Sequence, residues 1–231
     1  MKVAGASILR DTSIRLLSSA MVYEYAHHPA PHRQRKNRCV RPPTLRTERL
    51  LLRRWTDADR EAIAQLSADP EVMQFRPATL SRHESDALID ETEASFDQHG
   101  FGLWAVERLE DCRLLGYTGF GTSTFDAPFC PAVDIGWTLA RAAWGYGYAT
   151  EGARAALEYA FEQLQLDEVV AHTTKSNDRS RAVMIRLGMS HDAQDDFDAP
   201  WYQPGHPRRR FVLYRARAAD WRRRSRTMPA R

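Results

Sequence analysis

The sequence predicts an α+β domain, in which a mixed and mainly antiparallel β-sheet of about six or seven strands is flanked by helices on both faces. Three observations lead to this prediction. Short β-like runs dominate the chain before residue 140, and a helix–strand–helix–strand order follows them. The length of 231 residues, 43% of them hydrophobic, suits a single packed domain with tails.

The elements of the first half follow from local patterns. Residues 45–55 alternate and then run apolar, which predicts a first strand, and helical periodicity follows across 57–68. Ser81 and Glu84 have the spacing of a capping box, so a helix is expected to begin there and to end near Gly100. Three further strands are expected at 101–107, 113–120 and 133–139. A charged turn joins the first two of these as a hairpin, and a longer loop joins the second to the third.

The second half alternates helices with strands. A helix is predicted from about Gly147 to Gln163, and a strand at 167–174 follows it. A second helix is expected at 177–188 and a late strand at 209–217. No internal repeat is visible in the sequence, so we expect these elements to form one sheet with its helices.

The charge distribution separates a body from two basic ends. Residues 1–43 hold eight Lys and Arg against two acids, and residues 208–231 hold ten Arg against Asp220. The ends therefore carry +6 and +9, and a total of +3 leaves −12 for the body. We expect a disordered basic N-terminal extension at 1–43, a folded domain at 44–217 and a basic C-terminal tail at 218–231. We interpret both ends as solvated tails and do not expect nucleic acid as a partner.

Cysteine usage predicts neither a disulfide framework nor a zinc site. Cys39, Cys112 and Cys130 are widely spaced and form no CxxC pair. The histidines near Cys39 match no zinc template, so no metal is expected.

The hydropathy of the chain predicts a cytoplasmic protein without a membrane partner. No apolar run approaches the roughly 18–20 residues that cross a bilayer. Arg10, Asp11 and Arg15 interrupt the segment in which a secretory signal would lie.

Two glycines, Gly145 and Gly147, stand between the strand expected at 133–139 and an alanine-rich helix. A helix N-terminus exposes N–H groups without intrahelical partners, and glycines let that backbone approach a diphosphate. The P-loop is excluded because no Lys–Ser/Thr pair closes this turn, and the surroundings do not fit a dinucleotide fold. An ordinary structural turn remains the alternative.

A second polar turn follows the next strand. Asn177 and Ser180 stand at the start of the helix expected at 177–188. Asn177 suits an N-cap, and Ser180 suits a plain first-turn position. If the two strands are adjacent and parallel, however, both turns lie at one edge of the sheet and form a natural ligand crevice.

These segments together resemble a known family. WTLARAAWGYGYATEGARAALEYAF at 137–161 and NDRSRAVMIRLGM at 177–189 are similar to the GNAT superfamily of acetyl-CoA-dependent N-acetyltransferases. TLRTERLLLRRWTDAD at 44–59 and DPEVMQF at 69–75 add a resemblance to the branch of ribosomal-protein N-terminal-alanine acetyltransferases. The resemblance covers about 44–217. It implies the GNAT fold and acetyl-CoA as co-substrate.

The resemblance also implies where coenzyme A binds. The turn at 144–150 would hold the diphosphate, and the end of the preceding strand would hydrogen bond to the pantetheine arm. Arg141 is a candidate for the positive charge that the family often places ahead of its glycines. The implied cofactor-binding residues are Trp137, Thr138, Leu139, Trp144, Gly145, Tyr146, Gly147, Tyr148, Ala149, Thr150, Asn177 and Ser180.

Acetyl transfer to an amine needs a neutral amine, a polarised thioester carbonyl and a proton for the leaving thiolate. The resemblance implies direct attack in a ternary complex, with a backbone N–H near Leu139 polarising the carbonyl. Asp134 is a candidate base, and a strand carboxylate paired with an arginine is its alternative. Ser180 or Tyr214 is a candidate acid.

The acceptor is expected to be a primary amine, either a protein N-terminus or a small molecule. It is expected to bind among the helices of 57–99 and the loop at 195–210, where Trp201 and Tyr202 either line the site or plug an edge of the core. A non-catalytic acyl-CoA-binding or interaction module of the same fold is the competing class. The chain is expected to be a monomer or a homodimer.

Overall fold

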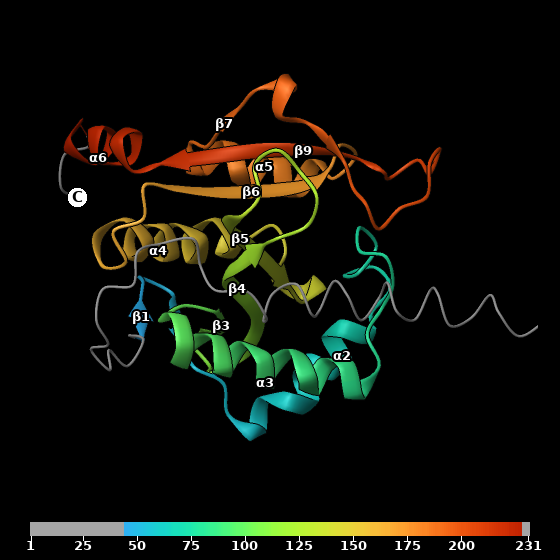
Figure 1. The fold of residues 1–231 in the computed structure, drawn as a ribbon. Coiled ribbons are helices and arrows are strands. Elements are labelled where there is room, and N and C mark those ends of the chain that lie inside the picture. Colours follow the sequence, from blue (N-terminus) through green and yellow to red (C-terminus); the bar gives the residue numbers. More distant parts are fainter. Residues whose placement is uncertain (1–43, 228–231) are drawn as a thin grey trace, which may run out of the picture.

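The computed structural model describes residues 44–227, so the expected extension at 1–43 lies outside the described residues (Figure 1). The fold class is confirmed: one large, mostly antiparallel sheet has helices on both faces. The sheet has nine strands. Six are the longer strands that the sequence predicts, and the other three are short strands of two residues each. The strands are β1 (Leu45–Arg46), β2 (Leu50–Arg53), β3 (Leu103–Arg108), β4 (Leu114–Ser123), β5 (Ala132–Leu139), β6 (Glu168–Thr174), β7 (Ser190–His191), β8 (Phe197–Asp198) and β9 (Arg210–Arg217).

The strand expected at 45–55 is two strands. β1 and β2 form a tight antiparallel hairpin in which Leu45 pairs with Leu52. The Thr47 hydroxyl accepts a hydrogen bond from the Leu50 N–H at 2.9 Å, and the Thr47 N–H donates to the Leu50 carbonyl. Alternating polarity cannot reveal such a turn because the same alternation continues through it.

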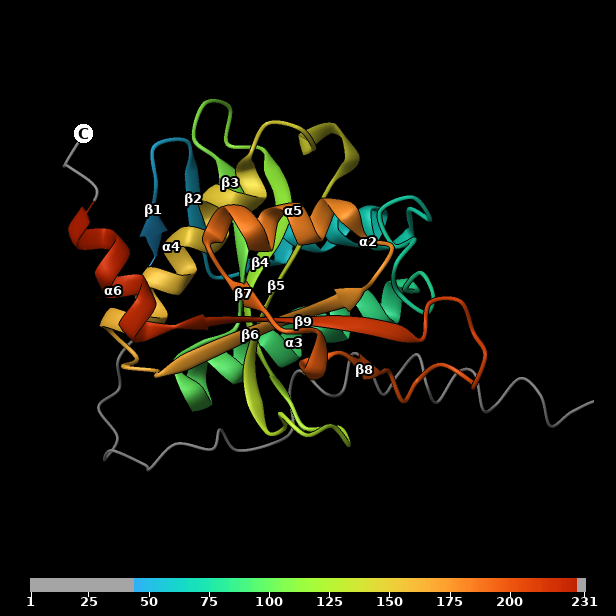
Figure 2. The same cartoon turned by 90° about the horizontal axis from the view of Figure 1, so that it is seen from above.

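The helices form two layers around the sheet. α2 (Arg60–Ala68) and α3 (Arg82–His99) lie against one face, and α4 (Tyr148–Glu162) and α5 (Asp178–Leu187) against the other (Figure 2). The capping box at Ser81 and Glu84 is confirmed, and α3 ends at Gly100 in the left-handed conformation with φ +78°.

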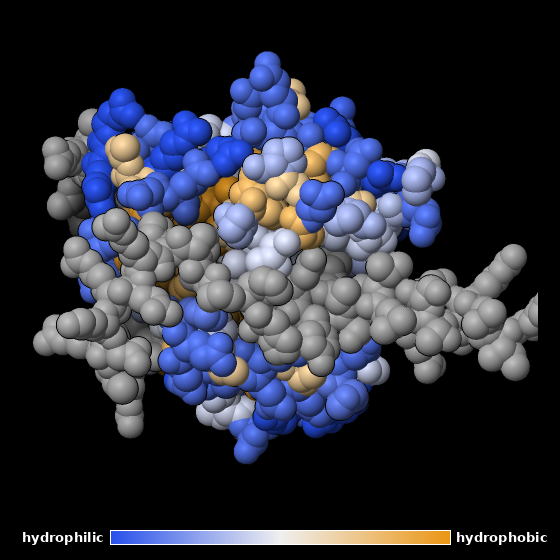
Figure 3. All heavy atoms as spheres, in the orientation of Figure 1, coloured by the Kyte–Doolittle hydropathy of each residue, from blue (hydrophilic) through white to orange (hydrophobic). Residues whose placement is uncertain are grey.

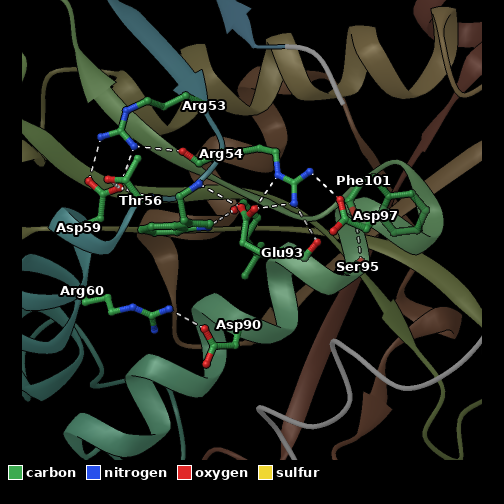
Figure 4. A network of polar contacts seen from close by, with 12 residues as sticks. Arg53, Arg54, Thr56, Asp59, Arg60, Asp90, Glu93, Ser95, Asp97 and Phe101 are labelled. Carbon is green, nitrogen blue, oxygen red and sulfur yellow. Dashed lines mark hydrogen bonds and ion pairs between the residues drawn. The ribbon is translucent and has the colours of Figure 1, made fainter. Parts of the chain in front are cut away.

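Ion pairs join the end of β2 to the first helical layer. The Arg53 guanidinium binds both carboxylate oxygens of Asp59 at 2.8 Å, at the start of α2 (Figure 4). Arg54 binds Glu93 at 2.6 Å and Asp97 at 2.7 Å, both on α3. The Arg53–Asp59 and Arg54–Glu93 pairs are only partly exposed, so they fix the position of the two helices more firmly than the pair with Asp97, whose side chain is exposed.

Three apolar clusters hold the layers together. The main one lies between the sheet and the helices α4 and α5, around Trp104, Phe161 and Leu157. A second joins α2 and α3 to the opposite face. The third lies where β6, β8 and β9 meet the loop between β4 and β5, around Phe197 and Phe211.

The chain after β9 forms a helix where the sequence predicts a tail. α6 (Ala218–Thr227) continues directly from β9. The Trp221 ring packs on Phe161 of α4, with ring centroids 5.7 Å apart, and Arg224 donates to the Gly188 carbonyl at the end of α5. This helix is hard to predict from the sequence, because its single aromatic residue stands among arginines that contact backbone carbonyls only in the folded chain.

The one parallel contact of the sheet lies between β5 and β6, and the register pairs these strands only at Asp134 and Val170. Every other pairing in the described residues is antiparallel. β6 is instead paired with β9 along its whole length. β5 and β6 therefore separate toward their carboxyl ends. The turn with Gly145 and Gly147 begins at the end of β5, and the turn with Asn177 begins at the end of β6.

Candidate active site

The glycine turn leads into the N-terminus of α4. A short 3-10 turn (Arg141–Ala143) ends β5, and Gly147 is the residue that precedes the helix. Gly145 and Gly147 have φ values of +85° and +83°, which L-residues with side chains rarely adopt. Because no side chain caps this helix, the turn presents backbone N–H groups and the positive end of the helix dipole together.

Arg49, which the sequence did not point to, braces this turn. Its guanidinium donates to the Tyr146 carbonyl at 3.1 Å, binds the Glu151 carboxylate at 2.6 Å and lies 4.7 Å from the centre of the Tyr148 ring. Glu151 also accepts from the Thr47 hydroxyl at 2.6 Å. Burial opposes ionisation of Glu151, but the hydrogen bonds from Thr47 and Arg49 outweigh it and lower its pKa. The hairpin of β1 and β2 thus fixes the first turn of α4.

Trp144 joins the two polar turns. Its indole N–H donates to the Leu139 carbonyl at 2.8 Å, so its ring lies against the end of β5. The Arg179 guanidinium from the first turn of α5 lies 4.3 Å from the centre of the same ring. The starts of α4 and α5 are therefore adjacent, as the crevice hypothesis requires. Arg141, by contrast, forms an ion pair with Glu71 at 2.6 Å. The positive charge that was expected to face the turn is therefore bound to a carboxylate of this chain.

The backbone of β5 faces the widening gap. The Ala140 N–H donates to the Leu115 carbonyl, and antiparallel pairing alternates in direction, so even-numbered residues of β5 direct their backbone groups at β4. The backbone groups of Trp137 and Leu139 therefore point toward the side where β6 has diverged. A ligand chain lying in this gap can bind the backbone groups of Trp137 and the Leu139 N–H as an added strand does, whereas the Leu139 carbonyl already accepts from the Trp144 indole.

Asn177 acts as the N-cap of α5. Its side-chain oxygen accepts from the Ser180 N–H at 3.2 Å, and its amide donates to the Thr173 hydroxyl at 3.0 Å. The ordinary structural interpretation of Asn177 is therefore confirmed. Ser180 is partly exposed on the first turn of α5. Tyr214 is buried under α5, with its ring stacked on His191 at 4.9 Å.

Asp134 lies on the opposite face of the sheet from α5 and is only 4% exposed. Its carboxylate accepts a hydrogen bond from the Ser123 hydroxyl at 3.1 Å. The Ser123 oxygen lies 3.3 Å from Nε2 of His172 on β6. The candidate base and the candidate acids thus approach the gap between β5 and β6 from different faces.

His172 is a member of this site that sequence reasoning missed. Burial and the positive charge of Arg76 lower its pKa to about 4, so its ring is neutral near pH 7. Five aromatic rings surround it, and its Nδ1 atom is buried. The only signal in the sequence was a histidine one residue from the middle of an apolar strand, which is an ordinary pattern.

The low pKa of His172 predicts an acid-dependent loss of stability. Between pH 6.5 and 4 the unfolded chain protonates this ring while the folded chain does not, so stability falls as pH falls through this window. A shift from 6.5 to about 4 corresponds to roughly 3 kcal/mol. Urea unfolding at pH 7 and pH 4.5 should therefore show a steeper loss for the wild type than for His172→Phe. Equal losses in both proteins would contradict the prediction.

Trp201 and Tyr202 belong to the third apolar cluster, so they close an edge of the core. Trp201 is partly exposed and its ring lies 6.3 Å from that of His172. Tyr202 is buried, and burial raises the pKa of its hydroxyl despite the nearby charges of Arg208 and Arg76. A role of either residue in binding an acceptor remains a prediction.

Within residues 44–227, no three His, Cys, Asp or Glu side chains are grouped so that they could hold a metal ion. None of the described helices is long and apolar enough to cross a membrane.

A sheet that opens between two parallel strands, with an uncapped helix start at the opening, is the arrangement that the resemblance to the acetyl-CoA-dependent acetyltransferases implies. The chain belongs to the GNAT family: the family model described as "Acetyltransferase (GNAT) domain" matches residues 49–190.

Relatives and solved structures agree with this assignment. The chain is 35% identical over 160 residues to the FsC-acetyl coenzyme A-N(2)-transacetylase of Aspergillus fumigatus, which covers 64% of this chain and 66% of that relative. A Bacillus subtilis protein, the uncharacterized N-acetyltransferase YnaD, is 28% identical over 149 residues, or 63% of this chain and 81% of its own.

Among solved structures, an acetyltransferase from Agrobacterium tumefaciens matches with a TM-score of 0.62 and 28% identity. The match covers 79% of this chain and 99% of that chain. RimL, a ribosomal L7/L12 α-N-protein acetyltransferase in complex with coenzyme A, matches with a TM-score of 0.61 and 17% identity, over 76% of this chain and 97% of its own. At that identity the likeness shows the fold alone. The ribosomal-protein branch is therefore one of several neighbours and is not singled out by them.

Proposed function

We propose that the protein transfers an acetyl group from acetyl-CoA to a primary amine by direct attack in a ternary complex. The observation that carries this proposal is the pairing of the open β5 backbone with the uncapped start of α4 at one edge of the sheet. A thioester arm and its diphosphate need these two features in this order. Residues 44–217 are the proposed transferase domain, and the family match at 49–190 lies inside it.

Coenzyme A is proposed to bind along this edge. The turn from Trp144 to Thr150 holds the diphosphate through its N–H groups, and the backbone at 137–139 hydrogen bonds to the pantetheine arm. Asn177 and Ser180 contact the arm from the start of α5. The structure favours the backbone as the main ligand, because Asn177 already uses its side-chain oxygen and amide within the chain.

The proposed chemistry moves two protons. The neutral amine attacks the thioester carbonyl, whose oxygen is stabilised by a backbone N–H near Leu139. Asp134 receives the amine proton, either directly or through Ser123. The carbon–sulfur bond then breaks, and Ser180 supplies a proton to the coenzyme A thiolate, so that amide and free thiol are the products.

The acceptor is proposed to be either a small-molecule amine or a protein N-terminus. The relative from Aspergillus fumigatus is named for transfer at an N(2) position, and the RimL structure for transfer to a protein α-amine. Both names describe amine acetylation, which supports the reaction class.

The test is a turnover assay of the full-length protein with acetyl-CoA and a panel of amines, following release of the coenzyme A thiol and the mass of the product. We expect a mass increase of one acetyl group on at least one amine. Tight acetyl-CoA binding with no acetylated product from any amine would favour the alternative, a non-catalytic acyl-CoA-binding module.

A further inference from the structure

Five aromatic side chains gather beside the end of the sheet at which Asp134 lies, and we call them the aromatic wall. Their ring centroids lie between 5.7 and 6.3 Å from that of His172. Figure 3 shows apolar residues gathered on the same side of the molecule as the loop between β4 and β5, with hydrophilic residues around them. The members of the wall are Phe125, Phe129, Phe197, Trp201 and Phe211.

The wall is connected to the proposed base. His172 lies between the rings, and its Nε2 atom is 3.3 Å from the Ser123 oxygen, which in turn is 3.1 Å from the Asp134 carboxylate. An amine that reaches Asp134 from this face of the sheet therefore has the wall beside the rest of its structure. The wall comes from segments far apart in the sequence, and three of its rings, those of Phe125, Phe129 and Trp201, are partly exposed.

Several buried polar atoms of the described residues have no hydrogen-bond partner, and two of them belong to neighbouring rings here. They are Nε1 of Trp201 and Nδ1 of His172, on rings 6.3 Å apart. Buried polar atoms of folded proteins are nearly always hydrogen-bonded, to the protein, to water or to a ligand. The indole N–H can donate only, so it suits an oxygen or a π-face of a bound molecule.

The charges around the wall suit one positive group rather than several. The carboxylates of the neighbouring loops are already bound within the chain: Asp69 to the Glu71 N–H, Glu71 to Arg141, Asp196 to His191 and Asp198 to Arg209 and Arg210. Asp126 is exposed on the loop between β4 and β5. Arg76 and Arg208 act electrostatically on Tyr202 behind the wall and repel further cations.

From these observations we infer that the acceptor is a small amine with a single positive charge, attached to an apolar group about the size of one ring. This inference rests on the proposed function and narrows its substrate class. Polyamines and aminoglycosides carry several ammonium groups, each of which would need a carboxylate of its own. A ring, in contrast, gains contacts with Phe125, Phe129 and Trp201.

The first experiment measures kcat/KM of the full-length protein with three amines: 2-phenylethylamine, ethylamine and spermidine. Ethylamine has the same reacting group without the ring, and spermidine adds charge. We expect 2-phenylethylamine to exceed each of the others at least roughly tenfold, the size of effect that apolar groups give in a hydrophobic site. Equal values, or a preference for spermidine, would overturn the inference.

A matched pair of variants tests whether the wall causes the preference. Trp201→Leu removes a ring of the wall, while Trp221→Leu removes a ring of the same type and similar exposure on α6. We expect Trp201→Leu to reduce the preference for 2-phenylethylamine over ethylamine to less than half of the wild-type ratio, and Trp221→Leu to keep it. Trp201→Phe, which keeps an aromatic ring but lacks the indole N–H, should retain most of it. Loss of the preference in both leucine variants alike would contradict a role of the wall.

Two further outcomes separate this inference from the proposed function. If no amine is acetylated, the proposed function fails, and the wall is then judged by calorimetric titration of 2-phenylethylamine and spermidine in the presence of coenzyme A. Tighter binding of 2-phenylethylamine would sustain the wall as a binding site, and tighter binding of spermidine would refute it. A tripeptide that begins with phenylalanine and is acetylated faster than 2-phenylethylamine would show that the acceptor is a peptide, against the inference.

Discussion

Gly147→Val is expected to weaken coenzyme A binding at least roughly tenfold, or about 1.4 kcal/mol. Gly147 has a φ of +83° directly before α4, and the nearest atom to an added Cβ is Nη2 of Arg49 at 3.7 Å. A valine therefore meets little of the protein itself, but it resists the left-handed backbone and places a branched side chain at the diphosphate. The measurement is calorimetric titration of the folded variant with coenzyme A.

Gly205→Val is the matched control for this substitution. Gly205 also has a φ of +83°, and no atom lies within 4 Å of an added Cβ there. Both variants carry the same backbone strain, so any excess loss of affinity in Gly147→Val reports on the turn itself. Thermal unfolding checks that both proteins are folded. If both variants bind coenzyme A equally well, the diphosphate binds elsewhere.

Asp134→Asn is expected to have the larger effect on turnover, and its size depends on the acceptor. A lysine-type amine has a pKa near 10.4 and is almost wholly protonated at pH 7, so a base is needed and the loss should be roughly 10²–10⁴-fold. An α-amino group, with a pKa near 7.7–8.0, is partly neutral, and the loss should be modest and partly recovered at higher pH. The measurement is a pH–rate profile of both proteins with whichever amine proves active.

Ser123→Ala separates a base from a relay. The Ser123 hydroxyl donates to Asp134, so its removal leaves the carboxylate in place but breaks the connection to His172. If the proton passes through Ser123, this variant should lose activity as Asp134→Asn does; if Asp134 contacts the amine directly, it should lose much less. Superimposable pH profiles of the wild type and Asp134→Asn would make Asp134 a structural carboxylate.

The sequence alone determined much of the fold, because strong local signals agreed with one another. The capping box at Ser81 and the glycine at position 100 set both ends of α3, and alternation located the long strands. Where the local sequence signals were weak, the sequence did not predict the element. The hairpin inside 45–55 is closed by hydrogen bonds of Thr47 to Leu50, and α6 packs on the domain through the contact of Trp221 with Phe161.

For the site, the sequence determined the two helix starts, because glycine and asparagine have conformational and capping preferences that act locally. Only the tertiary structure showed what surrounds those starts. Arg49, more than ninety residues before the turn, braces it through Tyr146 and Glu151. The hydrogen bonds of Ser123 with Asp134 and with His172 likewise join three strands. Such long-range contacts leave no periodic trace along the chain, since the pairing of strands, and not the spacing of residues, brings these side chains together.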